Sequence, residues 1–199
     1  MKFNCKNNTI LMSMLLIVLA SATTQAQIKL GVRAGLNASN VSFSSLPDRS
    51  ERFGYHVGIF ADVPVLPKFM SLQPEVSFST KGAGFKFINE RQTVDVNYVD
   101  LLLPVAFKLA AFDLQVGPFV SYLVSKPNFT VYSDNRVIAD AFKKFDAGLT
   151  AGLSYNINKI SIGVRYNQGF VNVTQDNAQL FLGNGKNAVG QVSLGYKFF

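Results

Sequence analysis

The residues that most often carry enzyme chemistry are scarce in this 199-residue chain. His56 is its single histidine and Cys5 is its single cysteine. A serine hydrolase would need His56 as a base between a nucleophile and an orienting carboxylate, and no such motif surrounds it. A zinc ion would find few of its usual nitrogen and sulfur ligands. We therefore expect no catalytic residue, metal ligand or cofactor, and we interpret His56 as a hydrogen-bonded structural histidine.

The charged residues form a more informative pattern, because many recur at alternate positions of segments whose other positions are apolar. Such alternation indicates a β-strand with one apolar and one polar face. The polar face carries five acids and six bases. They are Asp62, Glu75, Asp100, Asp113 and Asp146, and Lys29, Arg33, Lys81, Lys108, Arg165 and Lys197.

Eight segments alternate in this way, and each has about the length that a tilted strand needs to cross a bilayer. They are residues 28–37, 53–64, 69–81, 98–109, 112–124, 145–156, 160–167 and 189–199. The connections are alternately long (38–52, 82–97, 125–144, 168–188) and short (65–68, 110–111, 157–159). Short turns on one side and long loops on the other are typical of outer-membrane barrels. The sequence therefore predicts an all-β fold, an eight-stranded antiparallel up-and-down transmembrane β-barrel with both termini on the turn side.

Three prolines lie inside the predicted strands, at Pro74, Pro104 and Pro118. Each removes a donor from the hydrogen-bond ladder. We expect bulges or strand boundaries at these positions.

The first 26 residues have the pattern of a secretory signal peptide. Lys2 and Lys6 precede an apolar run at residues 10–20, and small residues follow up to Ala26. The run is too short to span a bilayer as a helix. We expect a signal peptide over residues 1–26 and one barrel domain over residues 27–199. Cys5 would leave with the signal, which excludes thiol catalysis and disulfides from the mature chain.

The net charge of +7 and a pI near 9.5 could indicate nucleic-acid binding. Export removes that partner, so we expect none. A lipocalin is also an eight-stranded barrel, with its apolar face inside. The balanced charges of the polar face and the absence of tryptophan favour the membrane alternative. The interior of an eight-stranded barrel is just wide enough for side chains to fill, so we expect a closed, salt-bridged lumen.

The ends of the predicted barrel suggest where partners could bind. Lys143 and Lys144 lie just before a strand on the loop side, where they could contact lipopolysaccharide. Phe198 has the parity of the apolar face and Phe199 is one residue beyond it. An aromatic end of this kind is a signal to the barrel assembly machinery. We expect outer-membrane lipid, lipopolysaccharide and that machinery as partners, with a protein partner of the loops as a further candidate.

Several segments together resemble the PorT-like, porin-family outer-membrane β-barrel proteins. They are GVRAGLNASNV, YVDLLLPVAFKLA, VGPFVSYLVS, KFDAGLTAGLSYNI, VRYNQGFVNV and the closing GYKFF. The resemblance covers essentially the whole mature chain. It implies a barrel in a Gram-negative outer membrane, and it implies no single activity, although the founding protein is linked to protein export.

The sequence leaves three functions open. The first is a non-enzymatic barrel whose loops have structural, adhesive or export-assisting roles. The second is a narrow porin that passes small solutes, and the third is an outer-membrane enzyme.

Overall fold

The computed structural model describes residues 28–43, 49–50, 52–87, 90–125, 144–171 and 185–198. Its regular elements are β1 (Lys29–Phe43), β2 (Arg49–Ser50), β3 (Arg52–Leu66), β4 (Met70–Leu72), β5 (Glu75–Phe87), β6 (Glu90–Leu102), β7 (Val105–Leu109), β8 (Phe112–Leu123), β9 (Phe145–Ile157), β10 (Ile160–Gly169) and β11 (Gly185–Lys197). In these ranges, no helix is long and apolar enough to cross a membrane.

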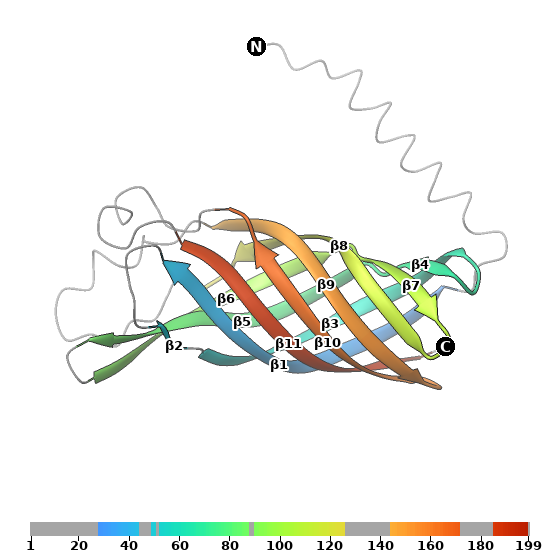
Figure 1. Cartoon of the computed structure of the whole chain (residues 1–199), viewed down its shortest axis with the longest axis horizontal. Coiled ribbons are helices and arrows are strands. Elements are labelled where there is room, and N and C mark those ends of the chain that lie inside the picture. The colour runs from blue at the N-terminus through green and yellow to red at the C-terminus, as the bar shows by residue number, and fades with distance from the viewer. Residues whose placement is uncertain are drawn as a thin grey trace, which may run out of the picture.

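The strands close into a ring in which every neighbouring pair is antiparallel (Figure 1). The last strand, β11, pairs with the first, β1, from Gly31 opposite Lys197 to Phe43 opposite Gly185. The elements β4 and β5 form one interrupted strand, as do β6 and β7, because both parts of each pair with the same neighbours. The ring therefore has eight strands in up-and-down order, which confirms the fold predicted from the sequence.

The prolines account for the interruptions. Pro74 separates β4 from β5, and Pro104 separates β6 from β7. Their carbonyl oxygens still accept hydrogen bonds from the neighbouring strand. Pro74 accepts from the Ala61 amide at 2.9 Å, and Pro104 accepts from the Gln73 amide at 2.8 Å. The Pro118 carbonyl accepts a hydrogen bond from the Leu103 amide at 3.0 Å. The nitrogen of Pro118, which has no hydrogen to donate, faces the same way, toward the interruption between β6 and β7 at residues 103–104.

The apolar positions face outward and the charged positions face inward. Ile59, for example, is 65% exposed, whereas its neighbour Phe60 turns inward and is buried. The Phe60 ring packs over Gly31, where an added Cβ would lie 2.7 Å from the ring. The Phe119 ring covers Gly148 in the same way, at 2.8 Å. Glycine at these two positions gives the inward aromatic rings room inside the narrow barrel.

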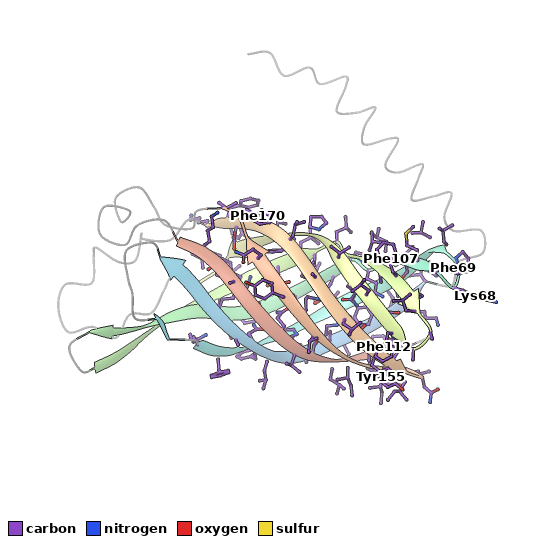
Figure 2. The ribbon with its side chains drawn as sticks, viewed as in Figure 1. Lys68, Phe69, Phe107, Phe112, Tyr155 and Phe170 are labelled. Carbon is purple, nitrogen blue, oxygen red and sulfur yellow. The ribbon has the colours of Figure 1, made fainter. Side chains whose placement is uncertain are left out.

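Exposed aromatic side chains mark both ends of the outer surface. At the turn end the rings of Phe112 and Tyr155 lie with their centroids 4.9 Å apart. Figure 2 shows these two residues, together with Phe69 and Phe107, at the turn end, and Phe170 toward the opposite end. Aromatic belts at the two interfaces are characteristic of membrane barrels.

The predicted loop limits need correction, because several strands extend beyond the segments predicted for them. The hairpin of β5 and β6 continues to the pair Phe87–Glu90, so most of the predicted loop 82–97 is strand. In the same way β1 extends to Phe43, β10 to Gly169, and β11 begins at Gly185. In the β5–β6 hairpin the alternation changes phase, from Val76 and Phe78 at even positions to Phe85 and Phe87 at odd ones. The predicted strand ends where its constant phase ends, whereas the backbone ladder continues past that point. Residues 126–143 and 172–184 of the other predicted loops lie outside the described residues.

Candidate functional site: the charged lumen

A triad of charges lies at the centre of the lumen. Glu75 is only 2% exposed. It accepts two hydrogen bonds from Arg165, from Nη1 to Oε1 at 3.2 Å and from Nη2 to Oε2 at 3.1 Å. It also forms an ion pair with Arg33, and both guanidiniums are buried. A bidentate pair of this kind fixes the geometry as well as the charge.

Two buried amides extend the triad across the barrel. Arg165 Nη2 donates to Gln115 Oε1 at 3.2 Å, and Gln115 Nε2 donates to Gln73 Oε1 at 2.9 Å. Gln73 Nε2 reaches Asp113 Oδ2 at 3.5 Å. Asp113 is therefore linked to the central charges through these two amides.

The central layer draws its members from four alternate strands of the ring. Arg33 comes from β1, Glu75 from β5, Gln115 from β8 and Arg165 from β10. Side chains from alternate strands point at one another from four directions, so their hydrogen bonds cross the full section of the barrel. The Phe60 ring adds to this layer, because the Arg33 guanidinium lies 4.6 Å from the ring centroid.

A second cluster lies nearer the loop end. Lys81 Nζ forms an ion pair with Asp100 Oδ1 at 2.8 Å and donates to Ser121 Oγ at 3.0 Å. The ammonium also lies 4.8 Å from the centroid of the buried Tyr98 ring. Asp146 is buried at this end and accepts a hydrogen bond from Asn187 Nδ2 at 2.9 Å.

A third cluster lies nearer the turn end and is built around the buried Asp62. Lys108 Nζ lies 3.2 Å from Asp62 Oδ2, and Lys197 Nζ lies 3.6 Å from the same oxygen. Lys197 also donates to Asn156 Oδ1 at 3.1 Å. Lys29 corrects our expectation: it has inward parity, but its side chain is exposed at the first position of β1. Its backbone is paired opposite the buried Asp62, but its side chain is exposed to solvent at the edge of the ladder.

His56 is buried and lies in an amide network. Its Nδ1 is 2.7 Å from Asn37 Oδ1, which also accepts from Gln191 Nε2 at 3.0 Å. Asn37 Nδ2 donates to Ser79 Oγ at 3.0 Å. The side-chain partner of His56 is thus an amide, whereas the histidine of a catalytic triad would need a nucleophile or a carboxylate as its partner. In the described part of the chain, no three histidine or acidic side chains gather as metal ligands.

The predicted lipopolysaccharide contacts lie at the loop end. Lys144 is exposed beside the start of β9. Lys143 lies outside the described residues.

The connecting amides are the members of the site that the sequence prediction missed. Gln73, Gln115 and Gln191 lie on the predicted polar face, but the predicted network comprises ionised groups alone. These glutamines are at inward-facing positions, and a buried amide must find hydrogen-bond partners. Their positions therefore could have predicted that they join the network. In the structure these amides connect polar groups that do not contact one another.

The charged clusters tie strands together across the lumen. Each cluster holds opposite signs, and each joins strands that are not neighbours in the ring. Such an arrangement can hold the wall in register.

The ring of tilted strands, with charges inside and apolar side chains outside, defines a membrane β-barrel of the outer-membrane type. Residues 21–175 match the sequence model of the family described as outer membrane protein beta-barrel domain, and the chain belongs to that family. The protein is therefore an outer-membrane protein of the porin-like, Gram-negative class. The strand β11 lies beyond the matched residues and closes the ring.

Two solved structures show the same fold at low sequence identity. Neisserial surface protein A (NspA) is 12% identical, with 85% of this chain and 97% of that chain covered and a TM-score of 0.56. Ail, the attachment invasion locus protein of Yersinia pestis, is 14% identical, with coverages of 86% and 99% and a TM-score of 0.50. A search of the curated proteins gives no match. At these identities the likeness concerns the fold alone.

Proposed function

We propose that this protein is a non-enzymatic outer-membrane barrel with a closed lumen, whose loop end carries recognition. The observation that supports closure is the central layer, in which Arg33, Glu75, Gln115 and Arg165 meet from four alternate strands. Moving any of the charged groups aside would separate it from its counter-ion, which is costly. A water-filled path through this layer is therefore unfavourable.

The loop end is the surface that remains free for a macromolecule. The outer wall faces lipid, and the inner face is occupied by its own side chains. Of the strands that the structure describes, the β5–β6 hairpin, with β2 paired to it at Arg49–Ser50, projects furthest at this end (Figure 1). Strands that continue beyond the barrel give a rigid support for binding residues. Lys143 and Lys144 would contact lipopolysaccharide there. The loops would have structural, adhesive or export-assisting roles, of which export is the one that the PorT-like resemblance suggests.

Conductance in planar bilayers tests the closed lumen. We expect the purified barrel to give no discrete current steps. Regular steps of constant size would favour the narrow-porin alternative and contradict the proposal.

Loop trimming tests where recognition lies. Shortening residues 125–144 should abolish capture of cross-linked partners from native outer membranes, whereas the barrel should still shift its gel mobility on heating. A matched control replaces Asn158 and Lys159 of the turn 157–159 with glycine, which should keep partner capture. Capture that persists after all four loops are trimmed would place recognition elsewhere.

A further inference from the structure

The turn end of the barrel carries an accumulation of lysines. Its strand ends and turns hold Lys29, Lys68, Lys108, Lys159 and Lys197, of which Lys29, Lys68 and Lys159 are exposed. The acids of this end in the described ranges are Asp62 and Asp113, and both are buried and already hydrogen-bonded. The exposed surface of the turn end is therefore positive.

The lysines form two neighbouring groups. Backbone hydrogen bonds join Lys197 N to Lys159 O at 2.8 Å and Phe198 N to Leu30 O at 2.8 Å. These bonds bring Lys159, in the turn before β10, close to Lys197 on β11 and Lys29 on β1. The exposed Lys159 ammonium also donates one hydrogen bond to Phe198 O at 3.0 Å, which leaves two of its three donors for a ligand. On another part of the ring, Lys108 N donates to Phe69 O at 2.8 Å, which places Lys68 and Lys108 together.

Apolar side chains surround Lys68, although turns are usually polar. Val65 and Leu66 at the end of β3 and Phe69 in the following turn are all exposed, and Phe69 is 72% exposed. Figure 2 shows Lys68 and Phe69 near Phe107 at the turn end. Three exposed apolar residues beside an ammonium would be unfavourable in water alone.

We propose that the turn end binds the phosphate headgroups of anionic phospholipids in the inner leaflet, with Lys68 and Lys159 as the principal contacts. At the boundary between headgroups and acyl chains, phosphate lies next to hydrocarbon. An ammonium beside exposed rings and alkyl groups can there bind the phosphate while the apolar groups contact the acyl chains. An acidic protein would satisfy the lysines but would leave Val65, Leu66 and Phe69 without an apolar partner. The proposal is independent of whether the lumen is closed.

The test compares lipid retention by variants that lose exposed lysines at opposite ends of the barrel. K68Q and K68Q/K159Q remove one and two charges at the turn end, and K186Q removes one charge at the loop end, where its side chain is exposed. The folded protein is equilibrated with vesicles of phosphatidylcholine that contain about a quarter phosphatidylglycerol, and the retained lipids are counted by native mass spectrometry. Each lysine near an anionic surface contributes about fivefold to binding, so two contribute roughly thirtyfold.

We expect the wild-type barrel and K186Q to retain phosphatidylglycerol preferentially, K68Q to retain less of it, and K68Q/K159Q to lose most of that preference. Replacing Lys68 and Lys159 with arginine should restore it, because the charge returns. An unchanged preference in K68Q/K159Q would overturn the proposal, as would a loss in K186Q as large as that in K68Q. Retention of an acidic periplasmic protein by the wild type, with no lipid preference, would assign the surface to a protein partner and refute the lipid site.

Discussion

Replacing Glu75 with glutamine should destabilise the barrel more than replacing either of its arginine partners. In the triad one carboxylate serves two guanidiniums, and all three groups are buried. E75Q leaves two adjacent positive charges with no anion between them. Removal of one partner from a buried ion pair costs about 3–5 kcal/mol, and we expect E75Q to lie in that range.

R33Q should cost less, because Glu75 keeps its two hydrogen bonds to Arg165 at 3.2 and 3.1 Å. What is lost is one hydrogen bond to a charged group, about 1.5–3 kcal/mol. R165Q should fall between the two, because it removes two bonds to Glu75 and one to Gln115 but leaves the Arg33–Glu75 pair.

The free energy of unfolding can be measured by urea titration in liposomes, with the heat-dependent gel shift as the readout of the folded barrel. K144Q, at an exposed site, is the control and should change the free energy by less than about 0.5 kcal/mol. A cost for R33Q as large as that for E75Q would refute the shared role of Glu75, and so would an E75Q barrel as stable as the control.

Two further substitutions test the packing and the lipid face. G148A should destabilise by roughly 1–3 kcal/mol, because its Cβ would lie 1.9 Å from the Gln168 carbonyl oxygen and 2.8 Å from the Phe119 ring. G190A is its matched control and should be neutral, because the nearest atom is 3.8 Å away; equal effects in the same urea titration would contradict the packing. V164R places a charge on the outer face, where Val164 is 55% exposed, beside the central layer. It should cost about 2–4 kcal/mol if this position lies near the midplane, with V164L as control; a cost below about 1 kcal/mol would show that this face does not meet hydrocarbon.

The faces of the strands could be predicted from sequence because alternation has a fixed period of two. Glu75 and Arg165 are at inward-facing positions of their strands, and the alternating apolar neighbours leave little choice of which face turns inward. Their contact could not be predicted, because the residues are 90 positions apart. Which charges meet depends on the stagger of the closed ring, and alternation within one strand contains no information about stagger.

The limits of the strands were harder to predict than their faces. Gly82 and Asp95 are paired in the ladder, and the sequence beyond them still alternates but in the opposite phase, with Phe85 and Phe87 at odd positions where Val76 and Phe78 are at even ones. Lys29 shows the opposite problem: it has inward parity and is paired in the ladder, yet its side chain is exposed, because parity alone does not say where burial ends. The connecting amides, such as Gln115, follow from the same parity once hydrogen bonding is considered along with charge.

The central claim is that side chains fill the lumen and exclude water, and thiol accessibility tests it most directly. With Cys5 replaced by serine, a single introduced cysteine is the only thiol in the chain. S77C and S121C place it at buried lumen positions with little change in size, and K159C places it at an exposed turn. We predict that a small charged thiol reagent labels K159C rapidly in the folded barrel and labels S77C and S121C only after heating. Labelling of S77C at the rate of K159C in the folded barrel would show a water-filled lumen and contradict the account.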